Sequence, residues 1–159
     1  RSFYVLFSSI VLWIIFLYWA PMPAIIWQIE NGMAVNAIWA LFAAGWLTVL
    51  LSTFLISHFE LFGLKQVYQN MVGGKPPEPK LQKPLFYKIV RHPLYLGFLI
   101  AFWATPVMTY GHLLFAVGMT IYIMIAIHYE EKDLTSIFGK EYEDYKGEVG
   151  KILPGIGKV

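Results

Sequence analysis

Four long apolar stretches alternate with polar segments along the chain. The stretches cover residues 3–19, 34–56, 94–107 and 112–129. A helix needs about 20 apolar residues to cross the hydrocarbon core of a bilayer. The last two stretches form one run that is interrupted near its middle by Pro106 and Gly111, which predicts a tight turn between two helices. We therefore expect an all-α fold, a polytopic transmembrane bundle of about four spans that ends in a helical hairpin.

The basic residues predict how this bundle is oriented. All 12 Lys and Arg residues precede the first stretch, lie between the second and the third, or follow the fourth. The positive-inside rule places these segments in the cytoplasm. We expect transmembrane helices 1 and 2 within residues 1–57, a cytoplasmic connection at 58–92, and the hairpin with a cytoplasmic tail at 93–159. The candidate site then faces the cytoplasm, where 81–92 meets the tail.

Composition narrows the chemistry that this fold can perform. The chain is 58% hydrophobic and 14% charged, whereas soluble domains are about half apolar and about a quarter charged. The absence of cysteine excludes disulfides, thiolate nucleophiles and Cys-based metal sites. The 4 histidines lack the spacing of a metal site. A net charge of +2 does not favour nucleic acid as a partner. We expect no metal, and a lipid bilayer as the surrounding medium.

Polar residues gather at the predicted start of the third helix. Pro93 suits the first turn of a helix, so Arg91 and His92 fall at its N-terminus. Free backbone N–H groups and the helix dipole favour an anion there, and the guanidinium of Arg91 could bind a carboxylate. The alternative is an interfacial anchor, in which Arg and Tyr side chains reach the lipid headgroups.

A second polar cluster follows the fourth stretch. We expect the helix to continue into the cytosol and to end at Gly139. Glu131 and Asp133 are interpreted as solvated, whereas Glu130 is nearest the membrane and is the candidate binding residue. Because the hairpin returns the chain to one face, Glu130 should meet the start of the third helix. A ligand with a carboxylate and with N–H or O–H donors could bridge the two clusters.

Three further residues are candidates for handling a proton at the membrane surface. They are His58, Glu60 and His128, each close to the cytoplasmic end of a predicted helix. For His58 and Glu60 the alternative is an interfacial polar belt with aromatic residues.

Read in order, several of these segments resemble the isoprenylcysteine carboxyl methyltransferase-like superfamily of membrane methyltransferases. The resemblance covers about residues 81–154. It rests on Arg91-His92-Pro93-Leu94-Tyr95-Leu96-Gly97, Glu130-Glu131-Lys132-Asp133-Leu134, Phe138-Gly139-Lys140-Glu141-Tyr142-Glu143-Asp144-Tyr145 and Ile152-Leu153-Pro154. It implies S-adenosylmethionine as the cofactor, held in a cytoplasm-facing pocket by Tyr87, His92, Pro93, Leu94, Tyr95 and Glu130. To these we add Arg91, on chemical grounds, as a group for the cofactor's carboxylate.

One departure from the superfamily bears on the acceptor. The enzymes that act on prenylcysteine are expected to carry Arg about one turn before Glu130, and Ala126 stands there. An apolar pocket suits a small neutral thiol. Segments 52–68, 101–106 and 111–116 are similar to the bacterial branch that methylates methanethiol. This similarity implies that the product is dimethyl sulfide and that the protein lies in a bacterial inner membrane. Two alternatives stay open: another acceptor, such as a prenylcysteine carboxylate or a phospholipid amine, and a non-catalytic membrane protein.

Overall fold

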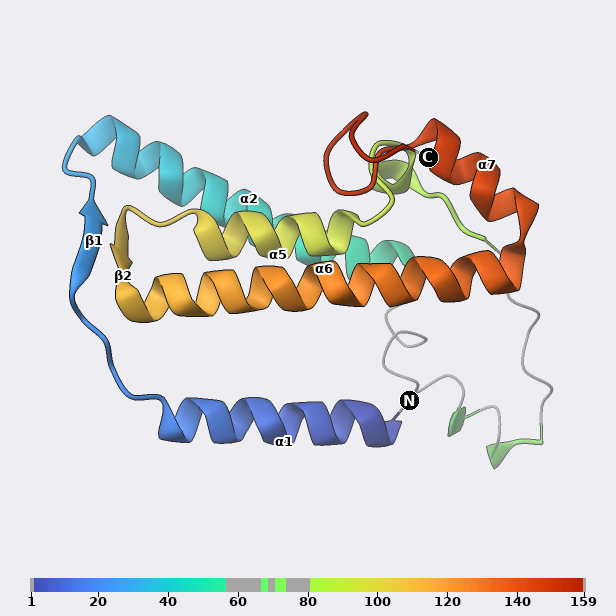
Figure 1. The fold of residues 1–159 in the computed structure, drawn as a ribbon, viewed down its shortest axis with the longest axis horizontal. Coiled ribbons are helices and arrows are strands. Elements are labelled where there is room, and N and C mark those ends of the chain that lie inside the picture. The colour runs from blue at the N-terminus through green and yellow to red at the C-terminus, as the bar shows by residue number, and fades with distance from the viewer. Residues whose placement is uncertain (1, 57–66, 69–70, 74–80, 159) are drawn as a thin grey trace.

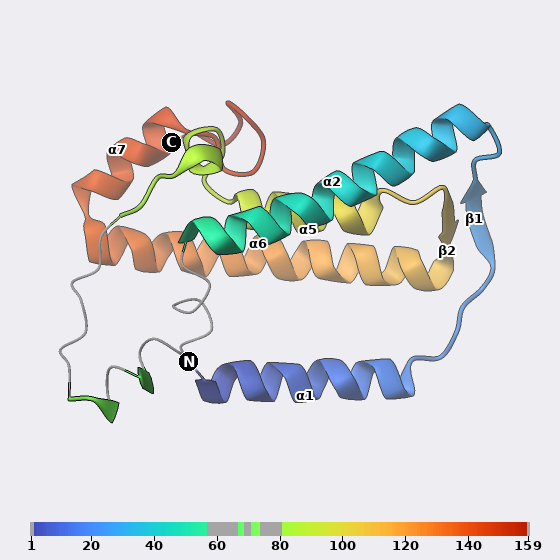
Figure 2. The same ribbon diagram turned by 180° about the vertical axis from the view of Figure 1, so that it is seen from behind.

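A computed structural model describes residues 2–56, 67–68, 71–73 and 81–158 of the chain. Within them, most residues are helical, and the helices run alongside one another in the two views of the fold (Figures 1 and 2). The elements are α1 (Ser2–Tyr18), β1 (Ile25–Gln28), α2 (Gly32–Ile56), the short 3-10 helix η1 (Leu85–Lys88), α5 (Pro93–Trp103), β2 (Val107–Thr109), α6 (Tyr110–Phe138) and α7 (Lys140–Glu148).

Each predicted apolar stretch forms a helix. Among the described residues, two helical segments are long and apolar enough to cross a membrane, Gly32–Leu55 and Tyr110–Phe138. The apolar helices Val5–Tyr18 and Pro93–Trp103 are shorter. The structure therefore supports a mostly helical protein with two candidate spans.

The expectation of an all-α fold missed a small antiparallel ribbon that joins two predicted loops. β1 pairs with β2, with Trp27 opposite Met108 and Gln28 opposite Val107. The indole N–H of Trp27 also donates to the carbonyl of Thr105 (3.3 Å). Both strands are too short to show a period along the sequence. Pairing satisfies backbone N–H and C=O groups that would otherwise be left without partners close to lipid.

Two glycines allow α2 and α5 to lie against each other. A Cβ atom on Gly45 would lie 2.8 Å from the backbone nitrogen of Ala101, and one on Gly97 would lie 2.8 Å from the carbonyl oxygen of Gly45. Small residues at such a crossing let two backbones approach closely. Trp46 packs edge-on against Phe98, with ring centroids 5.8 Å apart, beside this contact. The crossing fixes the position of α5 relative to α2.

The predicted continuation of the fourth helix as far as Gly139 is confirmed. α6 continues to Phe138, and Gly139 ends it with a positive φ of 53°. Residues 110–129 carry no Lys, Arg, Asp or Glu and are long enough to cross the hydrocarbon core, whereas the charged residues of α6 all follow them. α7 follows, and residues 149–157, which we call the C-terminal strap, then fold back. A parallel bridge pairs Gly150 of the strap with Val90.

Replacement of Gly97 by Ala should destabilise the protein by about 1–3 kcal/mol, because the added methyl group would overpack the crossing of α2 and α5. Thermal unfolding in detergent micelles measures this. Gly118→Ala is the matched control, since nothing lies within 4 Å of a Cβ there and alanine favours a helix over glycine. Equal melting temperatures for Gly97→Ala and the wild type would contradict the close crossing.

Candidate functional site

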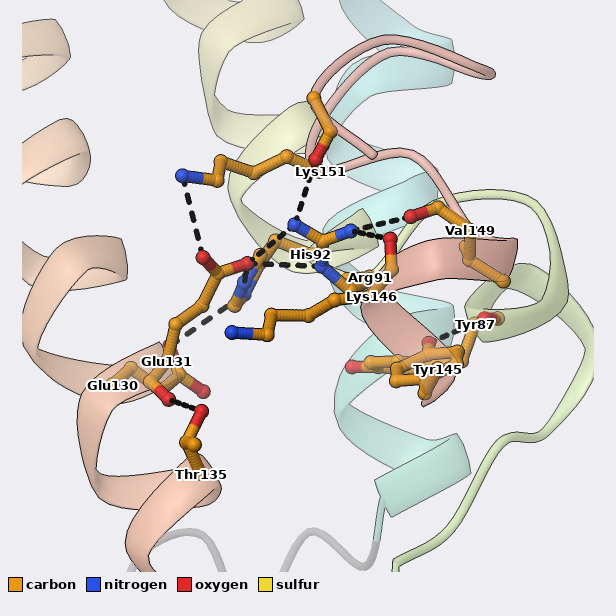
Figure 3. Close-up of polar contacts among 11 residues, drawn as sticks. Tyr87, Arg91, His92, Glu130, Glu131, Thr135, Tyr145, Lys146, Val149 and Lys151 are labelled. Carbon is orange, nitrogen blue, oxygen red and sulfur yellow. Dashed lines mark hydrogen bonds and ion pairs between the residues drawn. The ribbon is translucent and has the colours of Figure 1, made fainter. Parts of the chain in front are cut away.

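The site lies where the start of α5, the end of α6 and the C-terminal strap meet (Figure 3). Pro93 begins α5, and His92 is the N-cap with extended φ (−125°) and ψ of 63°. The φ is usual for a residue that precedes proline, whereas the ψ lies below the usual range of about 120–160°. The backbone N–H of Arg91 donates to the carbonyl of Gly150 (2.9 Å), and that of His92 donates to the carbonyl of Lys151 (3.1 Å). The strap therefore holds both residues by their backbone.

The side chain of Arg91 is fully buried within this junction. Its Nε donates to Oε1 of Glu131 (2.9 Å). Nη1 donates to the carbonyls of Lys146 (3.1 Å) and Val149, and Nη2 donates to the carbonyl of Gly157 (3.1 Å). Nη2 also lies 2.8 Å from Oε1 of Glu131. A guanidinium has five N–H donors, so these partners occupy nearly all of its capacity.

Glu131 is the centre of the ion-pair network. Its side chain is 13% exposed, and its Oε2 lies 3.3 Å from Nζ of Lys151. Its Oε1 lies 3.2 Å from Nε2 of His92. Burial of the carboxyl opposes ionisation, but hydrogen bonds from His92 and Arg91 and the charges of Arg91 and Lys151 outweigh it and lower the pKa of Glu131 to about 2. The interpretation of Glu131 as solvated is wrong, whereas Asp133 is exposed.

Glu130 lies on the more open side of the same cluster. Its side chain is 44% exposed, and its Oε2 lies 3.7 Å from Nδ1 of His92. The ring of Tyr95 lies 5.8 Å from that of His92 between centroids. In the first turn of α5, Pro93 is buried and Leu94 is half-buried. The fold therefore gathers these predicted residues around His92.

Three buried tyrosines lie close enough to the charged residues of the cluster to interact with them electrostatically. The hydroxyl of Tyr145 donates to the carbonyl of Tyr87, and burial raises the pKa of Tyr145 to about 12. Burial, followed by the charges of Glu130 and Tyr145, raises the pKa of Tyr87. Burial also raises the pKa of Tyr142, whose enclosed hydroxyl has no hydrogen-bond partner among the described residues. All three are protonated at neutral pH, and Tyr142 retains a donor that nothing there uses.

Comparison with known sequences identifies the family. Residues 35–141 match the phospholipid methyltransferase family, and the matched range includes the start of α5 and both glutamates. The chain belongs to the phospholipid methyltransferase family. This membership confirms the resemblance to membrane methyltransferases that the sequence motifs carry.

Relatives within this family are similar over almost the whole chain. The chain is 52% identical to a protein of Bradyrhizobium diazoefficiens named methanethiol S-methyltransferase 1, over 97% of this chain and 54% of that protein. It is 52% identical to methanethiol S-methyltransferase of Mycobacterium tuberculosis, over 97% of this chain and 63% of the relative. It is 51% identical to methanethiol S-methyltransferase of Pseudomonas deceptionensis, over 98% of this chain and 60% of that relative. The chain thus spans only part of each relative's length. No solved structure matches it.

Some of the candidate residues do not lie in the cluster around His92. His128 is exposed, and its ring packs edge-on against Tyr129. Both line a groove of about 550 Å³ along α6, with Thr120, Ile121, Met124 and Ile125. His58 and Glu60 lie outside the described residues.

Sequence reasoning missed three residues of the junction: Glu131, Lys151 and Tyr142. The burial of Ile127 explains the position of Glu131, because the residue four positions later lies on the same side of a helix, but the sequence alone does not show which side of α6 is buried. Lys151 reaches the junction only because the strap folds back, which no local pattern indicates.

Replacement of Arg91 by Ala should lower stability by about 3–5 kcal/mol, since it leaves Glu131 without its main buried partner. The strap should also detach, because the guanidinium no longer donates to the carbonyls of Val149 and Gly157. Hydrogen exchange of residues 149–157 in detergent measures the second effect. Lys132→Ala, which removes an exposed cation from the same helix α6, is the control. Unchanged protection of the strap in Arg91→Ala would contradict this structural role.

Proposed function

We propose that this chain is the membrane-embedded part of an S-adenosylmethionine-dependent methyltransferase that methylates methanethiol to dimethyl sulfide. The observation that carries the proposal is the similarity to relatives of that name, which is about 52% identity over 97% of the chain and includes the whole cluster around His92.

In this proposal the protein spans the bacterial inner membrane about four times. α1 and α5 add to the two longer apolar helices, and every Lys and Arg falls on the cytoplasmic side of the resulting topology. The cluster around His92 then faces the cytoplasm, where a soluble methyl donor can reach it.

The residues of the cluster fit the polar groups of S-adenosylmethionine. The half-exposed carboxylate of Glu130 suits an ammonium group or ribose hydroxyls, and Tyr95 offers an aromatic face beside His92. Burial of the unpartnered Tyr142 hydroxyl beside this cluster leaves one spare donor, which is costly unless something uses it. Arg91, with its donors engaged, acts by holding the site and not by binding the donor's carboxylate directly.

When bound, the donor supplies a methyl group on a cationic sulfur. The sulfur of methanethiolate forms a new bond to the methyl carbon as the carbon–sulfur bond of the sulfonium breaks, and that electron pair stays on the donor's sulfur. The protein has to align the two sulfurs and exclude water. Methanethiol's proton passes to His58, Glu60, His128 or water, and we propose these three residues as alternative bases. Because Ala126 occupies the position one turn before Glu130, no cation stands there to bind the carboxylate of a charged acceptor.

The test supplies purified protein in lipid nanodiscs with S-adenosylmethionine that carries a trideuterated methyl group. Separate reactions contain methanethiol, a prenylcysteine or phosphatidylethanolamine. We expect labelled dimethyl sulfide in the headspace of the first reaction, measured by mass spectrometry. Labelled prenylcysteine ester or labelled phospholipid without any labelled dimethyl sulfide would replace the proposed acceptor.

Replacement of Glu130 by Ala should weaken binding of S-adenosylmethionine by about 10- to 100-fold, because a charge-assisted hydrogen bond contributes about 1.5–3 kcal/mol. Isothermal titration calorimetry measures the affinity. Glu143→Ala, which removes an exposed carboxylate from α7, is the matched control. Equal affinity of the Glu130→Ala variant and the wild type would remove Glu130 from the site.

A further inference from the structure

The two nitrogens of His92 face different surroundings. Nε2 lies 3.2 Å from Oε1 of Glu131, within hydrogen-bond distance. Nδ1 lies 3.7 Å from Oε2 of Glu130, which is beyond it. The side chain of His92 is 4% exposed, so the packed ring cannot exchange these positions without disturbing the junction. The structure therefore distinguishes the two nitrogens before any ligand binds.

The partner of Nε2 fixes the position of a ring proton. Glu131 is paired with Arg91 at 2.8 Å and with Lys151 at 3.3 Å, so its carboxylate is ionised and can only accept hydrogen bonds. Nε2 must then carry a hydrogen to form its contact with Glu131. In the neutral ring, the lone pair is therefore on Nδ1, because a neutral imidazole has one donor and one acceptor nitrogen.

The side of His92 that carries Nδ1 is also the accessible side. Arg91 and Glu131 close the Nε2 side, with side chains 0% and 13% exposed. Glu130, beside Nδ1, is 44% exposed. Within the described part of the chain, no Lys or Arg lies within ion-pair distance of Glu130. A ligand that arrives there meets one carboxylate and one ring acceptor, which together suit a positively charged N–H donor.

We propose that Glu131 is a positioning residue, which holds His92 through Nε2 and so presents Nδ1, beside Glu130, to the ammonium group of the methyl donor's amino-acid part. This inference rests on the proposed function for the identity of the ligand. Glu131 does not touch the ligand itself. Its contribution is to disfavour the alternative tautomer. In that tautomer Nδ1 carries the hydrogen, so one N–H donor would face the N–H donors of the ammonium group and no hydrogen bond could form between them.

Three variants separate positioning from a merely structural role. Glu131→Ala removes the acceptor of both Arg91 and His92. Glu131→Gln loses the charge but keeps an oxygen in the place of Oε1, which contacts both of them. Lys151→Ala removes the ion pair to Oε2, so it loosens the strap and leaves the contact between His92 and Glu131 in place.

The experiment combines nitrogen-15 NMR of labelled histidine with calorimetric titration of S-adenosylmethionine, in detergent and at a pH where the ring is neutral. His92→Gln identifies the signals of His92. We expect the wild type and Lys151→Ala to show a protonated Nε2 and an unprotonated Nδ1. Glu131→Ala should show a mixture of tautomers and bind about 10-fold more weakly, as expected for the loss of about 1.4 kcal/mol. Glu131→Gln should restore the single tautomer and most of the affinity.

The outcomes separate this inference from the proposed function. A single Nε2–H tautomer in Glu131→Ala would overturn the inference. So would an affinity of Glu131→Ala equal to that of Asp133→Ala, the exposed-carboxylate control on the same helix, or an equal loss of affinity in Lys151→Ala. Failure of the wild-type protein to bind S-adenosylmethionine would overturn the proposed function and, with it, the ligand assigned to His92.

Discussion

The guanidinium of Arg91 is fully buried, and a buried cation is stable only when acceptors surround it. The chain supplies these acceptors from segments that are far apart in the sequence: Glu131 from α6, and backbone carbonyls from the end of α7 and from the strap. No single element could satisfy the charge alone. Burial of this one side chain therefore requires α5, α6 and the strap to meet, and the cluster around His92 forms at their meeting point.

Different interactions hold the helices together at the two ends of the bundle and along its middle. At the end far from the cluster, backbone hydrogen bonds between β1 and β2 join the first connection to the hairpin turn (Figure 1). Along the middle, the glycine crossing sets α5 against α2. At the opposite end, ion pairs and hydrogen bonds to backbone carbonyls hold the segments together. Each type of interaction suits its place, because ion pairs lie outside the uncharged part of α6, and close packing of small residues acts within the apolar part of the bundle.

The sequence predicts the helices well, since long uncharged stretches have few alternatives to helices. It also indicates His92, Glu130 and their neighbourhood. It did not predict which of two adjacent glutamates turns inward. In a soluble helix, alternating polar and apolar faces would reveal this rotation. A membrane helix is apolar on every side, so the buried face of α6, which includes Ile123 and Ile127, has no contrast with the lipid-facing side. The sequence does not predict that the strap contacts Arg91, because the contacts use backbone carbonyls, which every residue has and which therefore leave no sequence pattern.

Arg91 is far from its partners along the chain, and this separation sets the order in which the parts of the junction can form during synthesis. The carbonyl of Gly157 lies 66 positions after Arg91, and synthesis at about 5–20 residues per second needs about 3–13 s to cover that distance. During this interval the guanidinium cannot adopt its final burial, because one of the carbonyls that surround it has not yet been synthesised. The junction can close only once the strap has left the ribosome, so the helices are placed first and the cluster around His92 is assembled last.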